Sequence, residues 1–204
     1  MSAAQPFPAG TIDWSGENPG MYLKETPDGP FVSLVSFFRV VLSPHGRGHG
    51  LVLLEAPKAA ESRPDALNVC VTDNEPLARY LMANFVCHFG AFRGQPAVAA
   101  VEYRRLDAVE TEGDSRSRYQ ERVTGQGIEA VLTWDELGPP FMVDMPADRG
   151  ATGAHRMFSL FVDCHRATAE INGRALKGRS QPRDFAGRTS TTAFLAFSET
   201  WLRV

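Results

Sequence analysis

Residues 31–56 read FVSLVSFFRVVL, SPHGRGHG and LVLLEA, and this stretch decides the fold. The first run, residues 31–42, and the last, residues 51–56, are rich in β-branched, aliphatic and aromatic side chains, which favour β-strands. The middle run holds three glycines and a proline, which turn the chain. A glycine-rich loop that cradles phosphate precedes a helix, whereas a strand follows this one. The sequence therefore predicts an antiparallel β-hairpin.

The rest of the chain continues the strand pattern with one interruption. Between residues 74 and 88 the apolar side chains recur at helical spacing. Asp73 or Asn74 can cap the start of this helix, and Pro76 is tolerated in its first turn. Further strands are expected over residues 66–72, 97–109, 118–124, 128–137, 141–145, 156–171 and 189–203. Because short turns join most of them, we predict a mainly β (α+β) protein: an antiparallel curved sheet or barrel with one packed helix.

The length of the chain and the distribution of its proline and glycine residues predict its domain organisation. A chain of 204 residues can bury a sizeable core, and no linker or internal repeat divides it, so residues 1–204 are expected to form a single domain. The first thirty residues are dense in proline and glycine, which indicates an irregular N-terminal arm over residues 1–30.

Composition argues against several classes of protein. A net charge of −3 does not favour nucleic-acid binding, and the chain has no apolar run long enough to span a membrane. The N-terminus lacks the basic start and apolar segment of a signal peptide, so we expect a cytoplasmic protein. Three cysteines at irregular spacing suggest neither a disulfide framework nor a metal site, and the absence of a cofactor motif predicts no cofactor.

The strand predicted over residues 156–171 carries the first candidate site. Alternation places Phe161, Asp163 and His165 on one face. If this face lines the interior of a barrel, Phe161 contacts a ligand and Asp163 orients His165 as a general base. If the face meets solvent, the two polar residues form a surface ion pair. The same two alternatives hold for Glu102 with Tyr103 and Arg104, and for Glu199 with Trp201 on the last strand.

Two charged residues of the first hairpin form the second candidate site. Arg39 interrupts an apolar strand and Glu55 ends one, and burial of a charge is costly unless it is paired. Arg39 and Glu55 therefore belong either to a ligand site or to strand ends at the surface. In a ligand site Arg39 would bind a carboxylate through two hydrogen bonds. His45 and His49 could share a metal ion, but two histidines form an incomplete ligand set, so no metal site is predicted.

Asp73-Asn-Glu-Pro76 follows an apolar strand and opens the predicted helix. Together with the preceding glycine-containing turn and the strand that ends in Glu55, this motif resembles the acetoacetate decarboxylase-like family over about residues 31–92. The resemblance implies a mostly β barrel around a small apolar pocket, with Glu55 matching the family's active-site glutamate. The family's catalytic lysine would fall near residues 87–89, where this chain has Cys-His-Phe, so imine chemistry lacks its amine. His88 is the polar side chain nearest to that missing lysine.

Three functions follow as hypotheses. The first is binding of a small organic acid or carbonyl compound by a decarboxylase-like β-barrel without the Schiff-base lysine. The second is lyase, isomerase or hydrolase chemistry, with His88 or the Asp163 and His165 pair as base and Arg39 holding a carboxylate. The third is a non-catalytic module whose open sheet edge forms a homo-oligomer or docks a partner chain.

Overall fold

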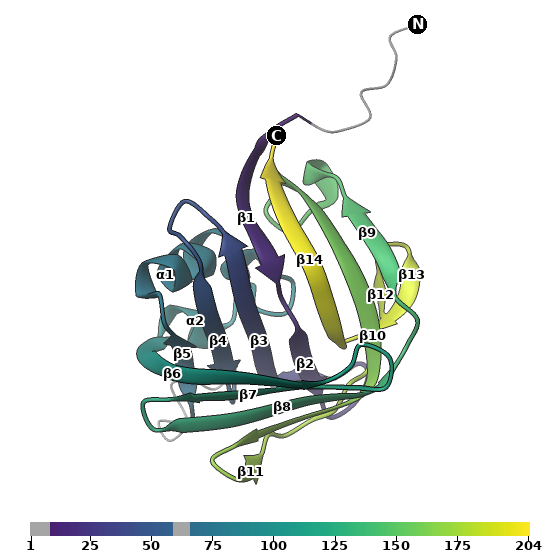
Figure 1. Ribbon diagram of the computed structural model, residues 1–204. Coiled ribbons are helices and arrows are strands. Elements are labelled where there is room, and N and C mark those ends of the chain that lie inside the picture. The colour runs from purple at the N-terminus through teal and green to yellow at the C-terminus, as the bar shows by residue number, and fades with distance from the viewer. Residues whose placement is uncertain (1–8, 59–65) are drawn as a thin grey trace, which may run out of the picture.

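The strands of this protein close into a barrel, as the computed structural model of residues 9–58 and 66–204 shows (Figure 1). The strands are β1 (Thr11–Glu17), β2 (Gly20–Lys24), β3 (Phe31–Leu42), β4 (Gly48–Leu54), β5 (Asn68–Thr72), β6 (Glu102–Gly113), β7 (Arg118–Gly125), β8 (Ile128–Leu137), β9 (Phe141–Met145), β10 (His155–Ile171), β11 (Arg174–Ala175), β12 (Pro182–Phe185), β13 (Arg188–Thr191) and β14 (Ala193–Arg203). In the described chain nine of them form the ring, in the order β14, β2, β3, β4, β5, β6, β7, β8 and β10, and β10 pairs again with β14. The prediction of a mainly β barrel is confirmed.

The strands outside the ring extend it. β1 lies along β14, β9 pairs with β10, and β12 and β13 form a separate two-stranded hairpin. In Figure 1 the strands from β1 to β5 stand beside β14 and β10, while β6, β7 and β8 run across one end of them. The hairpin predicted from residues 31–56 is β3 paired antiparallel with β4.

One strand pair differs from the predicted antiparallel pattern. β5 and β6 pair in parallel, because a helical segment between them returns the chain along the outside of the sheet. This segment contains α1 (Glu75–Asn84), the 3-10 turn η1 (Val86–His88) and α2 (Pro96–Ala99). Asn74 caps α1 as expected, since its Oδ1 accepts the Leu77 N–H at 3.1 Å. The helix ends at Asn84, four residues before the predicted end.

The predicted irregular arm is wrong for the strands β1 and β2. Both pair with β3 and with β14, which supplies backbone hydrogen-bond partners to a segment rich in turn-forming residues. Gly16 is needed inside β1 because a Cβ there would lie 2.1 Å from the carbonyl oxygen of Arg39. The glycines thus mark a close approach of strands, and residues 1–8 of the predicted arm lie outside the described residues.

The two faces of the sheet bury two separate cores. Alternate residues of β3 divide between them: Val35 and Phe37 join the cluster inside the barrel, whereas Leu34 and Phe38 join the cluster beneath the helical segment. The barrel cluster also holds Met21, Leu51, Leu53, Val69, Val71, Val123, Ile128, Leu132, Trp134, Val162 and Leu195, all at most 3% exposed. Side chains therefore fill the barrel, and the expected ligand chamber inside it is replaced by core.

In the ranges that the structure covers, no helix has both the length and the apolar character needed to cross a bilayer.

Candidate functional site

A large cavity, with a volume of about 620 Å³, lies outside the barrel. Its floor comes from β2, β10 and β14, and its walls come from the loop after η1, from residues 149–151 and from the hairpin of β12 and β13. Seven aromatic side chains line it: Tyr22, Phe31, Phe89, Phe161, Phe185, Phe194 and Trp201. Four basic side chains, Lys24, Arg93, Arg149 and Arg183, accompany two acidic ones, Asp184 and Glu199. The cavity is therefore lined mainly by aromatic side chains, with an excess of basic over acidic groups.

A β-bulge in β14 aims Glu199 into this cavity. Phe158 pairs with Thr200 and Leu160 pairs with Phe197, so two residues of β14 lie opposite the single residue between them in β10. The extra residue is Ser198, which adopts a φ of 51°. Before the bulge the even-numbered residues of β14 face the cavity side, and after it the odd-numbered ones do. The bulge thus turns Glu199 and Trp201 toward the cavity.

The two oxygens of the Glu199 carboxyl have different surroundings. Its Oε1 accepts hydrogen bonds from Trp201 Nε1 at 2.7 Å and from Asn18 Nδ2 at 3.3 Å. Ser36 Oγ donates to Asn18 Oδ1 at 2.6 Å, which fixes the amide with its NH₂ toward Glu199. Within the described chain no side chain or backbone group bonds to Oε2. Glu199 is 2% exposed, and burial raises its pKa from 4.5 to about 7 against the lowering effect of the two hydrogen bonds.

Arg183 on β12 presents a partly buried cation at the same cavity. Its guanidinium carbon lies 4.6 Å from the ring centre of Phe185, 4.8 Å from that of Phe194 and 6.0 Å from that of Tyr22. Its Nε and Nη2 atoms are buried and have no hydrogen-bond partner among the described residues. Burial lowers the pKa of Arg183, although the guanidinium stays charged in proteins. The aromatic ring faces therefore stabilise the charge, while Nε and Nη2 have no hydrogen-bond acceptor among the described residues.

Two of the predicted site residues line this cavity. His88 ends η1 at its wall, and Phe161 lies on its floor from β10. Phe161 stacks on Phe194 with ring centres 5.1 Å apart and packs against Phe185 at 4.9 Å. The structure thus brings both residues to the lining of one cavity.

The predicted pairing of Asp163 with His165 is wrong. Asp163 is 6% exposed and accepts hydrogen bonds from Ser190 Oγ and from the backbone N–H of Thr191, and Arg188 Nη2 lies 3.6 Å from its Oδ2. The His165 side chain is exposed, and within the described residues it forms no bond to Asp163. Asp163 instead holds the separate hairpin against β10, because Ser190 and Thr191 of β13 donate hydrogen bonds to it.

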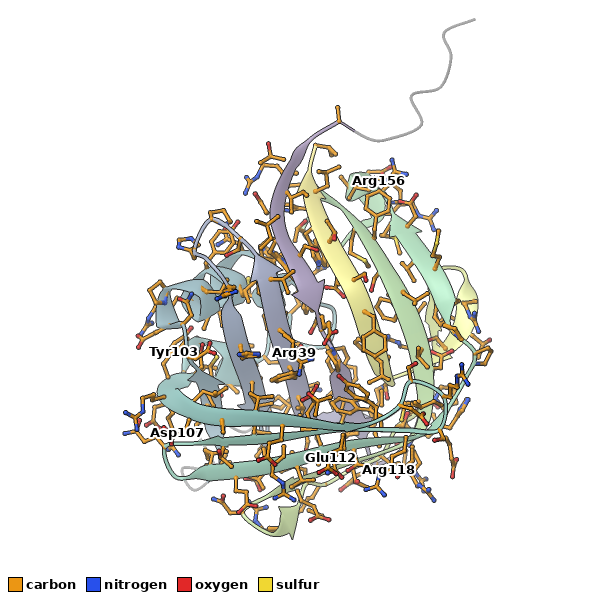
Figure 2. All side chains as sticks on the ribbon, in the orientation of Figure 1. Arg39, Tyr103, Asp107, Glu112, Arg118 and Arg156 are labelled. Carbon is orange, nitrogen blue, oxygen red and sulfur yellow. The ribbon has the colours of Figure 1, made fainter. Side chains whose placement is uncertain are left out.

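Arg39 and Glu55 also serve the fold. Arg39, which Figure 2 labels on β3 near β6, pairs with Glu17 and with Glu121 and donates to Thr111. These bonds use the guanidinium donors of Arg39 that were expected to hold a ligand carboxylate. Glu55 lies directly after β4 and forms a bidentate ion pair with Arg174 at 2.5 and 2.9 Å. Neither residue lines the large cavity.

A smaller cavity of about 400 Å³ borders Arg39 and contains a histidine–carboxylate pair. His49 Nδ1 lies 2.7 Å from Asp73 Oδ2, and the His49 backbone N–H donates to Asp73 Oδ1 at 2.6 Å. The pair is half-exposed and joins β4 to the start of α1. In the described parts of the chain no three His, Cys, Asp or Glu side chains gather in a way that could hold a metal ion.

Comparison of the chain with protein-family models, with curated proteins and with solved structures finds no match. The resemblance to the acetoacetate decarboxylase-like family therefore stays a prediction.

Proposed function

We propose that this protein binds a small organic acid in the large cavity on the outer face of its barrel. The observation that carries the proposal is the guanidinium of Arg183, whose Nε and Nη2 atoms are buried without a partner in the described chain. A buried donor without an acceptor is costly, and a charged donor more so. A carboxylate accepts two parallel hydrogen bonds from one edge of a guanidinium, so it satisfies both atoms at once.

The aromatic lining of the cavity supports a ligand with an apolar, flat body. Phe161, Phe194 and Trp201 present ring surfaces on the floor, and a volume of about 620 Å³ suits a molecule of drug-like or metabolite size. The excess of basic over acidic side chains attracts an anion to the opening. These features support the predicted class of ligand, an organic acid, and move its place from the barrel interior to the outer face.

Replacement of Arg183 with glutamine is expected to weaken the binding of phenylpyruvate about 10- to 100-fold, since hydrogen bonds to a charged group contribute about 1.5–3 kcal/mol. Isothermal titration calorimetry with the wild-type protein and the variant measures this change. The matched control is Arg105→Gln, because that side chain is 80% exposed and lies outside the cavity. Equal affinity in the wild type and the Arg183 variant would contradict the proposal. Native mass spectrometry of the purified protein would show a co-purified acid directly.

A further inference from the structure

The carboxyl of Glu199 and the guanidinium of Arg183 line the same cavity, and the ligand-binding proposal gives the carboxyl no task. We propose that Glu199 is a catalytic acid–base that moves a proton between its Oε2 atom and a carbon atom of the bound acid, so that the cavity catalyses enolisation of a 2-oxo acid. This inference rests on the proposed binding of an organic acid at Arg183.

Hydrogen bonding determines which oxygen of Glu199 carries the proton. Oε1 faces the N–H groups of Trp201 and Asn18, and a proton on that oxygen would oppose both donors. The neutral carboxyl therefore holds its proton on Oε2, and the ionised carboxyl presents its free lone pairs there. Because Glu199 lines the cavity and nothing in the described chain bonds to Oε2, that atom is available to a ligand.

The setting of Glu199 lets both protonation states occur near neutral pH. Burial raises its pKa to about 7, which is the range in which a general acid–base works best at physiological pH. The ionisable groups around the cavity are Tyr22 and Lys24 of β2, His88 and Arg93 of the helical segment, Arg149, and Arg183 and Asp184 of β12. Lys24 donates to the carbonyl of Pro27 and Arg93 donates to the carbonyls of His88 and Ala151, so both have other partners.

Besides a base, enolisation requires a cation beside the oxygen atoms that gain negative charge, and Arg183 supplies it. A 2-oxo acid carries its carbonyl next to its carboxylate, and the adjacent Nε and Nη2 donors of Arg183 can bond to one oxygen of each group. Arg183 and Glu199 line the same cavity, so a single bound acid can reach both.

The proton transfer needs no further reactant. The C3–H bond of the acid breaks and its proton passes to Oε2 of ionised Glu199, while the C–H electron pair forms the C2–C3 double bond. The C2 carbonyl π electrons move onto the oxygen, where Arg183 stabilises the enolate. Return of the proton to C3 restores the acid, and its delivery to oxygen gives the enol. In either case Glu199 is ionised again at the end.

The test follows the exchange of the C3 protons of phenylpyruvate for deuterium by NMR in deuterium oxide. The wild-type protein is expected to accelerate exchange over buffer alone, with a rate that rises as the pH increases through about 7, because the base is the ionised carboxyl. Glu199→Gln is expected to lose about 100-fold or more of the protein-dependent rate. Its affinity for phenylpyruvate should stay within a few-fold of the wild type, since Arg183 is intact.

Controls separate this inference from the binding proposal. Glu170→Gln, on an exposed position of β10, should exchange like the wild type. Trp201→Phe removes one donor to Oε1 and should move the midpoint of the pH profile upward while it keeps the base. Phenylpyruvate that binds without accelerated exchange overturns the catalytic role and leaves the binding proposal standing. Retention of the wild-type exchange rate by Glu199→Gln, or an unmoved midpoint in Trp201→Phe, also overturns it, whereas no binding of phenylpyruvate defeats both.

Discussion

Replacement of Arg39 with methionine is expected to lower the free energy of unfolding by about 3–5 kcal/mol, the cost of leaving a buried partner charge unpaired. Its partner Glu121 is 0% exposed and points from β7 into the end of the barrel. Glu121 accepts hydrogen bonds from Arg39, from Tyr119 at 2.9 Å and from Thr111 at 2.8 Å. Methionine fills a similar volume but leaves the carboxylate without its counter-charge.

Urea denaturation of the wild type and Arg39→Met measures this loss. The double variant Arg39→Met, Glu121→Gln should recover most of it, because both members of the buried pair are then neutral. Arg105→Met is the control, since this exposed pair with Asp107 should contribute less than about 1 kcal/mol. A change of less than 1 kcal/mol in Arg39→Met would show that Arg39 is not needed to compensate Glu121, and would return it to the list of ligand-binding candidates.

Replacement of Glu199 with glutamine is expected to stabilise the protein at pH 8 and to leave its stability near pH 4.5 unchanged. In the folded protein burial raises the pKa of Glu199 from 4.5 to about 7. Between these values the folded state binds more protons than the unfolded state, so stability falls as the pH rises through this window and levels off above it. This difference between the two pKa values corresponds to about 3 kcal/mol of stability. The wild type loses this stability as the pH rises, whereas the glutamine variant retains it because its side chain does not titrate.

Thermal or urea unfolding at several pH values between 4.5 and 8 checks this prediction. Glutamine keeps a carbonyl oxygen at the position of Oε1, so the bonds from Trp201 and Asn18 remain. Glu170→Gln should follow the wild-type curve, because its side chain is exposed. If the stability of Glu199→Gln and of the wild type changes in parallel across this pH range, the carboxyl is ionised throughout and the acid–base role loses its support.

Local patterns in the sequence were sufficient for much of the fold. The apolar runs around the turn at residues 43–50 predict β3 and β4, and the Asn74 cap predicts the start of α1. Asn172 and Gly173, with φ of 50° and 72°, form the tight turn that an Asn-Gly pair indicates. The high density of turn-forming residues gave a wrong prediction for β1 and β2, because glycine there permits close strand packing and does not mark an irregular arm.

The candidate site was harder to predict, since its residues depend on contacts between distant elements. His88 was identified from the resemblance to a known family and Phe161 from the alternation of a predicted strand, and both line the cavity. Arg183 stands in a short polar stretch with no motif, and only the packing of its hairpin over Tyr22 and Phe194 makes it a partly buried cation. Glu199 was noted as an ambiguous strand residue, and the two-residue spacing to Trp201 is the signal that places both on one face.

By itself, the sequence determined most of the β-strands, the capped helix and several turns, because side-chain periodicity and turn chemistry act over a few residues. Tertiary structure alone decided that the barrel interior is filled and that the cavity lies outside it, because ring closure assigns alternate side chains to two cores. It also decided which charges are paired. Arg39 meets Glu121 across 82 positions of the chain, whereas a bulge of one residue turns Glu199 to the cavity that Arg183 faces.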